Sequence, residues 1–136
     1  MALTNEACLF YLEELKWHGT PTCPYCGSTR STPIPKEWRY HCNYCFTSYS
    51  VTVNTIFHRS HVSLSKWFKA IFLIESSQDT ISVRSLAAQI AVTKNTASSL
   101  MRRIREAKQD NPQEISKIVE FYKKFVDESR RTRQDL

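Results

Sequence analysis

The chain has 136 residues, a formal net charge of +6 and a pI near 9.2. Its length allows one ordinary domain or two very small ones, and its basic balance favours a polyanion partner, of which nucleic acid is the commonest. No run approaches the ~18 apolar residues of a membrane span, and the glutamate-interrupted N-terminus does not resemble a signal peptide. We therefore expect a cytoplasmic, nucleoid-associated protein, or a nuclear one in a eukaryote, with no membrane partner.

Residues 4–17 predict the first helix. Thr4 or Asn5 can cap its N-terminus, and the apolar residues that follow lie near helical spacing. A glycine and a proline soon after Trp17 end the pattern. Cys8 falls on the apolar side of this helix, where we interpret it as a small core residue rather than a metal ligand.

Residues 22–57 have a different character and predict a small β module. Glycine, proline, serine and threonine flank the cysteines of this segment. WRYHC (residues 38–42) and SYSVTV (residues 48–53) alternate apolar and polar residues with a period of two, as half-buried strands do.

Four cysteines of this module form two C-x2-C pairs with fifteen residues between them: Cys23 with Cys26, and Cys42 with Cys45. The spacing fits a zinc site, because each pair presents two thiolates from one tight turn and two turns supply a tetrahedral Zn²⁺. A redox dithiol would open a helix in a βαβ unit, and two disulfides would need an oxidising compartment, so both alternatives fit less well. Gly27 follows its pair where left-handed backbone is often needed. Four thiolates close the coordination sphere, which predicts one structural zinc and no metal chemistry.

From residue 63 to the end the pattern is helical. Residues 63–76 carry a broad apolar face, and residues 82–90 and 93–108 form two further helices with almost no linker. Residues 113–130 carry a stripe at i, i+3, i+4 and i+7.

The helices at 82–90 and 93–108 have helix-turn-helix patterning. Ala87 is small where the two helices must cross, and Thr93 can cap the second helix. Over residues 81–108, six basic residues stand against one acid, Glu106, so the segment has a net charge of +5 (six minus one). Basic, asparagine and serine side chains on the exposed face suit phosphates and base edges, whereas an ordinary solvated hairpin would not need them. The candidate DNA contacts are Arg84, Thr93, Lys94, Asn95, Ser98, Ser99, Arg102 and Arg103, with Arg39 from the β module.

One further pattern extends over roughly residues 9–108. It consists of FYLEELKW, CPYCGSTR, RYHCNYCFTSYSVTVNTIFHRSHVSLSKWFKAIFLI and LAAQIAVTKNTASSLMRRIREA, of which TIFHRSH followed by KWF-AI is the more specific part. It resembles the N-terminal part of bacterial insertion-sequence transposases of the zinc-ribbon, Merlin-like group. The resemblance implies a zinc ribbon and a helix-turn-helix that bind the terminal repeats of the element. In that family an RNase H-like domain follows, whose acidic residues hold two metal ions and which cuts and joins DNA.

The sequence departs from this family in three places. Asn54 and Ala91 stand where glycine is expected, although asparagine tolerates left-handed backbone. Only 28 residues follow Lys108 (136 − 108), which we expect to be too few for an RNase H-like sheet, so the two-metal site is not carried over. The late carboxylates are interpreted as the solvated face of the last helix: Asp110, Glu114, Glu120, Asp127 and Glu128.

We thus expect an α+β chain with a zinc ribbon, a helix-turn-helix bundle and flanking helices. Its expected parts are an N-terminal helix, the ribbon, the helix-turn-helix bundle, and an amphipathic helix with a basic tail, at residues 1–21, 22–57, 58–110 and 111–136. The expected function is binding of double-stranded DNA without enzymatic activity, as a transposase-derived recognition subunit or regulator. The last helix either packs back on the bundle or, as we prefer, forms a homodimer or partner interface. Two alternatives stay open: a protein-interaction adaptor that docks through the ribbon and last helix, or the DNA-binding fragment of a full transposase.

Overall fold

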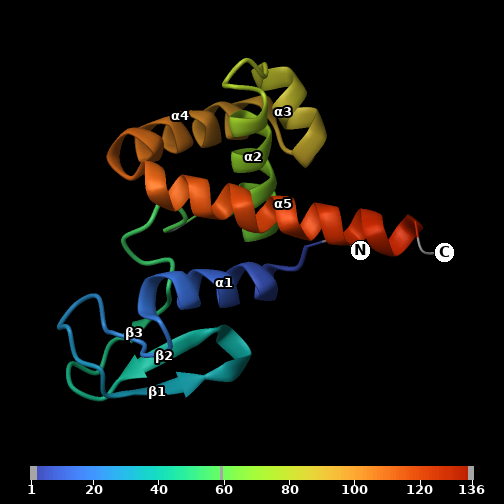
Figure 1. Cartoon of the computed structure of the whole chain (residues 1–136). Coiled ribbons are helices and arrows are strands. Elements are labelled where there is room, and N and C mark those ends of the chain that lie inside the picture. Colours follow the sequence, from blue (N-terminus) through green and yellow to red (C-terminus); the bar gives the residue numbers. More distant parts are fainter. Residues whose placement is uncertain (1–2, 59, 135–136) are drawn as a thin grey trace. The chain divides into compact units, whose positions relative to one another are not determined.

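The computed structural model describes residues 3–58 and 60–134. Over these residues the fold is α+β, as predicted, with five α-helices, one short 3-10 turn and a three-stranded antiparallel sheet (Figure 1). Two compact units are present: Thr4–His61 contains the first helix and the sheet, whereas the second unit begins at Val62, contains the other four helices and includes Leu3. None of the helices in the described part of the chain has the length and apolar character needed to cross a membrane.

Helix α1, Asn5–Trp17, confirms the first predicted helix. Of the two candidate caps, Thr4 is used, and its hydroxyl accepts the backbone N–H of Ala7 at 3.1 Å. The helix ends at His18, whose φ of 49° is left-handed and whose N–H donates to the carbonyl of Glu14.

The sheet has the order β1-β2-β3, with β1 at Ser31–Ile34, β2 at Arg39–Cys42 and β3 at Ser48–Tyr49. A 3-10 turn, Pro35–Glu37, and a left-handed Trp38 connect the first two strands. Strand β1, which contains Pro33, was not among the predicted elements. Proline is tolerated there because β1 lies at the sheet edge, where Pro33 is paired with Tyr40 of β2.

The predicted strand at residues 48–53 is wrong beyond Tyr49. Val51 and Val53 are buried, but they lie in consecutive turns. Their carbonyls accept hydrogen bonds from the ammonium of Lys16 at 3.3 and 2.9 Å, and the Val53 N–H donates to Ser50. The alternation in SYSVTV therefore arises because the two valines are buried, not because the segment is a strand. Turns and the ammonium of Lys16 satisfy the backbone groups that a neighbouring strand would otherwise pair.

Three aromatic rings join α1 to the sheet within the first unit. Tyr40 and Tyr49 are paired across β2 and β3 and stack with their centroids 5.7 Å apart. Trp17, from the end of α1, meets both rings edge-on at 5.5 and 5.8 Å. Such aromatic pairs contribute about 0.5–1.5 kcal/mol each beyond their burial, so α1 is an integral part of this unit.

The second unit consists of four helices: α2 at Leu64–Ser76, α3 at Val83–Ile90, α4 at Lys94–Asp110 and α5 at Pro112–Gln134. The hydroxyl of Ser82 caps α3 by accepting the N–H of Ser85 at 3.1 Å. Thr93 caps α4 in the same way, accepting from Thr96 at 3.2 Å, as predicted. Ser63 is the N-cap residue of α2 but makes no side-chain cap hydrogen bond.

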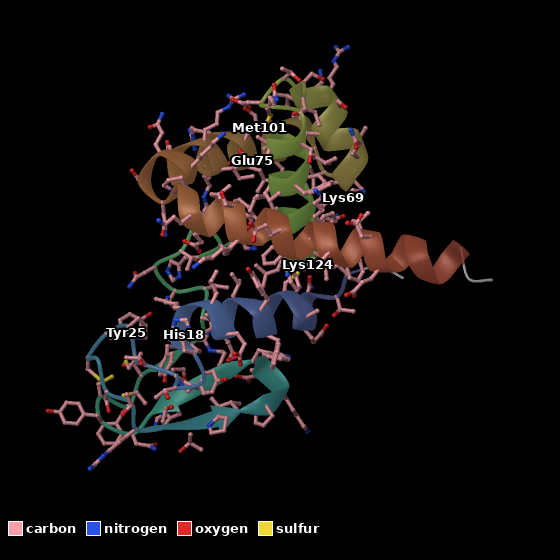
Figure 2. The ribbon with its side chains drawn as sticks, viewed as in Figure 1. His18, Tyr25, Lys69, Glu75, Met101 and Lys124 are labelled. Carbon is pink, nitrogen blue, oxygen red and sulfur yellow. The ribbon has the colours of Figure 1, made fainter. Side chains whose placement is uncertain are left out.

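All four helices contribute to one apolar core, in which α5 packs against α2 and α4. Phe121 meets Phe68 edge-on at 5.9 Å, and Tyr122 lies 4.9 Å from Phe72. Figure 2 marks Met101 of α4, which is buried in this unit. The first half of α5 therefore packs back on its own bundle, and a partner interface on this helix stays a prediction. The buried residues of the unit include Trp67, Phe68, Ile71, Ile74, Leu86, Ile90, Ala97, Leu100, Ile104, Ile115 and Ile118.

Replacing Ala91 by glycine is expected to stabilise the bundle by about 0.5–1 kcal/mol. Ala91 ends α3 with a φ of 58°, a conformation that costs an L-residue energy but costs glycine none. Urea denaturation of the zinc-loaded protein measures the change. Ala88→Gly is the matched control: Ala88 is exposed in the interior of the same helix, so this change should destabilise by about 1 kcal/mol. If both variants changed the free energy of unfolding in the same direction, the role of the left-handed cap would be contradicted.

Candidate metal centre and basic helix face

The two C-x2-C turns of the first unit have the same backbone geometry. In the first, the N–H of Gly27 donates to the carbonyl of Cys23 at 2.9 Å, and the Cys23 N–H donates to Ser28 at 3.0 Å. In the second, Phe46 donates to Cys42 at 2.9 Å and Cys42 to Thr47 at 2.9 Å. The residue after each pair is left-handed, with φ of 80° at Gly27, as expected, and 64° at Phe46. Each turn thereby presents both of its sulfur atoms to the same side.

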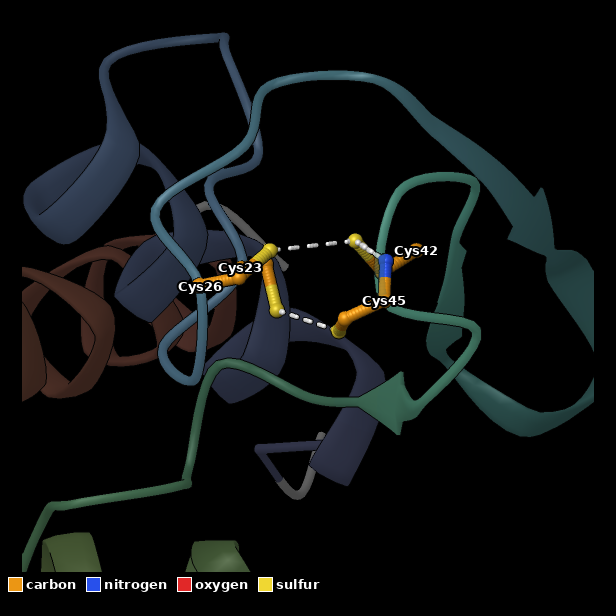
Figure 3. A group of neighbouring side chains, drawn as sticks. All are labelled: Cys23, Cys26, Cys42 and Cys45. Atoms are coloured by element: carbon orange, nitrogen blue, oxygen red, sulfur yellow. Dashed lines mark hydrogen bonds between the residues drawn. The ribbon is translucent and has the colours of Figure 1, made fainter.

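The four predicted ligands meet at one point between the two turns (Figure 3). The Sγ atoms of Cys23 and Cys45 are 3.7 Å apart, those of Cys26 and Cys42 are 3.5 Å apart, and all four lie within 4.8 Å of one another. A tetrahedron with Zn–S bonds of about 2.3 Å has sulfur–sulfur edges of about 3.8 Å. A disulfide would require about 2.05 Å. The sulfur positions thus fit a tetrahedral ion, and both of these separations are far longer than a disulfide bond.

Backbone N–H groups favour the thiolate form of two of the four cysteines, Cys42 and Cys45. The N–H of Cys45, which lies 3.5 Å from the Sγ of Cys42, and that of Tyr44 lower the pKa of Cys42 to about 6. The N–H of Thr47 likewise lowers the pKa of Cys45. Because the thiolate is the form that binds a metal, these donors favour ligation at neutral pH.

Cys8 is separate from this cluster, as predicted. Its side chain is fully buried, and burial, with a smaller effect of Glu6, raises its pKa to about 12. The thiol therefore stays protonated and acts as a small apolar residue.

The outer face of α4 carries the exposed members of the predicted DNA-contact set. Lys94, Asn95, Ser98 and Arg102 are exposed along this helix, and Arg84 is exposed on α3. No ion pair of Arg84, Lys94 or Arg102 is found within the part of the chain that the structure describes. These five side chains remain available to a ligand. Ser99 is half-buried.

Other basic residues of α4 are engaged within the bundle. Arg105 donates from Nε and Nη2 to the carboxylate of Asp79 at 3.0–3.1 Å. Lys108 pairs at 3.1 Å with Glu75, which is labelled in Figure 2. The guanidinium of Arg103 lies over the ring of Trp67, 5.2 Å from its centroid. Of these three, only Arg103 was a predicted DNA contact, and each of the three has an intramolecular contact.

Two lysines of α2 hold the turn between α3 and α4. The ammonium of Lys69 donates to the carbonyl of Gln89 at 2.9 Å, and that of Lys66 donates to Ala91 at 3.2 Å. Both carbonyls belong to the end of α3, where the helix dipole also favours positive charge. This role of the two lysines was not predicted. Its only signal was the i, i+3 spacing of two lysines on a largely apolar helix.

The double change Lys66→Met and Lys69→Met is expected to cost about 1–2 kcal/mol of bundle stability, because each removes a charged donor from a helix-end carbonyl. Chemical denaturation with zinc present measures the loss. Lys123→Met with Lys124→Met removes the same charge from exposed positions of α5 and should change stability by less than about 0.5 kcal/mol. A similar loss in both double variants would show that net charge, rather than the α3 cap, is responsible.

Two predicted DNA contacts do not lie on the outer face of α4, namely Thr93 and Arg39. The hydroxyl of Thr93 is used in the cap, accepting the Thr96 N–H and donating to the Thr96 hydroxyl at 2.9 Å. Arg39 lies in β2, half-buried, and is paired with Ile34 in the sheet register. The C-x2-C turns themselves carry exposed aromatic side chains, namely Tyr25 (Figure 2), Tyr44 and Phe46.

Comparison with known families supports the metal centre. Residues 3–48 match the family model of the transposase zinc-ribbon domain. The match includes α1, β1, β2 and all four clustered cysteines, and it ends before the helical unit begins. The chain matches no curated protein and no solved structure. The sulfur geometry and this family match together identify Cys23, Cys26, Cys42 and Cys45 as the ligands of one structural zinc ion.

Proposed function

We propose that this chain binds double-stranded DNA through α3 and α4, which act as a helix-turn-helix, next to a transposase-type zinc ribbon. In this proposal α4 is the recognition helix and α3 lies across the backbone. The Merlin-like transposases that the sequence resembles use such a pair of modules at their terminal repeats. The family match over residues 3–48 supports the transposase-type zinc ribbon of this proposal.

The observation that carries the proposal is the way in which the charges of α4 are distributed. Arg105 and Lys108 form ion pairs with acids of the bundle, whereas Lys94 and Arg102 are exposed and have no ion pair within the described part of the chain. A helix that needed positive charge only for its own stability would not place its unneutralised groups together on one outer face. Such a face suits the phosphates on either side of a groove.

The polar residues of the same face suit base recognition. Asn95 and Ser98 are exposed between Lys94 and Arg102. Asparagine can pair with the N6 and N7 edge of adenine, and serine is short enough to let the helix approach. In the proposed complex, Arg102, Lys94 and Arg84 therefore position the helix, and Asn95 and Ser98 read the bases.

The proposed role is recognition rather than catalysis. We assign no DNA cleavage to the described residues, and the chain acts as a recognition subunit, a regulator or the DNA-binding part of a larger transposase. The alternative is a protein-interaction adaptor. In an adaptor the basic residues of α4 would not be needed for binding its partner.

Binding of the zinc-loaded chain to short duplexes across a salt series tests the proposal. The logarithm of the binding constant should fall linearly with the logarithm of salt concentration, with a slope of roughly 0.9 per phosphate contacted. Negligible affinity at low salt for every duplex, including mixed-sequence pools, would favour the adaptor and refute DNA binding.

A further inference from the structure

The zinc-ribbon unit also contains a pocket, and none of the four clustered cysteines lines it. It is a pocket of about 280 Å³ lined by residues of α1, of the turn after it and of the start of β2. Pockets for drug-sized ligands usually occupy about 300–1,000 Å³, so this one suits a single side chain. Its lining combines aromatic rings with carboxylates: Phe10, Glu13, Glu14, Trp17, Trp38 and Tyr40.

The aromatic walls are held in place in different ways. Trp17 and Tyr40 are held by each other, because their rings meet edge-on with centroids 5.5 Å apart. Phe10 projects from α1 and is 60% exposed. Trp38 stands at the end of the 3-10 turn with a φ of 53°, a left-handed conformation that costs a bulky residue roughly 1–2 kcal/mol. Strained positions of this kind cluster at binding sites.

The pocket is also acidic, in a chain whose net charge is positive. Glu13 accepts a hydrogen bond from the hydroxyl of Tyr40, which orients its carboxylate, and Glu14 is exposed. The nearest basic residue of the helix, Lys16, donates to the carbonyls of Val51 and Val53. Among the residues that the structure describes, neither glutamate has an ion pair.

We propose that this pocket binds the ammonium group of a lysine from a partner polypeptide. The faces of tryptophan, tyrosine and phenylalanine attract a cation, and carboxylates accept its N–H groups. The four-carbon stem of lysine packs on aromatic surface while its charged end reaches the acids. A phosphate is excluded, because it would meet two carboxylates at close range. The site is therefore distinct from the DNA-binding face on α4 and does not depend on it.

Titration of the zinc-loaded full chain with short peptides tests the proposal. The probe is a five-residue peptide with capped ends and one central lysine, and its counterpart carries norleucine, which keeps the stem and lacks the charge. The lysine peptide should shift the indole N–H resonances of Trp17 and Trp38 with millimolar affinity. The norleucine peptide should bind at least tenfold more weakly, a difference of about 1.4 kcal/mol. Equal shifts with both peptides, or none with lysine, would overturn the proposal.

Variants of α1 and of Trp38 then show whether the lysine peptide binds in this pocket or is attracted only by the overall charge. Glu14→Gln removes one carboxylate from the pocket and should weaken lysine-peptide binding at least threefold. Glu6→Gln removes the same charge from an exposed position in the first turn of the same helix and should leave it unchanged. Trp38→Leu should abolish the preference for lysine over norleucine while zinc stoichiometry stays at one. Equal weakening by Glu14→Gln and Glu6→Gln would contradict a built site.

Discussion

Removal of the zinc ion is expected to unfold the ribbon unit, residues 4–61, and to leave the helical bundle folded. Structural zinc sites contribute roughly 10–16 kcal/mol of apparent binding free energy at neutral pH, whereas whole domains are stable by only about 5–15 kcal/mol. The ribbon has a small apolar core and a sheet of short strands. The bundle has its own apolar core, and all four clustered cysteines belong to the ribbon unit.

Metal analysis and amide NMR with a strong chelator measure this outcome. The untreated protein should contain one zinc per chain. On chelation, dispersed signals from Arg39–Cys42 should collapse while those from α2 to α5 persist. Cys42→Ser should abolish stoichiometric zinc binding, whereas Cys8→Ala, which removes a buried thiol outside the cluster, should retain one zinc per chain. A metal-free, fully folded ribbon with two disulfides would refute the assignment.

Loss of two exposed charges from α4 is expected to weaken duplex binding at least tenfold. In the double variant Lys94→Gln and Arg102→Gln, the number of released counterions falls, so the slope of log K against log salt should decrease by about 2. Both side chains are exposed, and surface changes of this kind rarely alter stability by more than about 0.5 kcal/mol. Fluorescence anisotropy at four or more salt concentrations gives affinity and slope together.

The matched control removes the same charge from the same helix. Arg105→Gln with Lys108→Gln deletes two positive charges whose partners are Asp79 and Glu75. Net charge falls equally in both double variants, so a non-specific effect of charge would weaken binding equally. The proposed interface requires the control to retain most of its affinity and its salt slope. Equal slopes in the two variants would contradict recognition by the outer face of α4.

Local signals in the sequence predicted the helices and the zinc ligands well. Helix α1 begins after Thr4, and α3 and α4 begin after Ser82 and Thr93, because capping and apolar periodicity act within a few residues. The cysteine spacing was sufficient for the metal site, since each C-x2-C turn is itself a local structure. Asn54 is left-handed with a φ of 64°, as its place in a glycine position indicated.

Features that depend on distant partners could not be predicted in this way. Strand β1 exists because β2 pairs with it, which outweighs the unfavourable Pro33. The engagement of Arg103 with Trp67 joins residues 36 positions apart in the chain (103 − 67). Periodicity places both on helices, but it does not say which charges fold inward. The set of candidate DNA contacts therefore became smaller only when the structure showed which basic side chains have intramolecular partners.

The central claim is that the outer face of α4 binds duplex DNA, and an amide NMR footprint tests it most directly. With zinc-loaded protein and a short duplex, the account predicts the largest shifts at residues 93–102 and around Arg84, with small shifts in α5. Shifts confined to the ribbon, or none at concentrations that saturate binding, would contradict it.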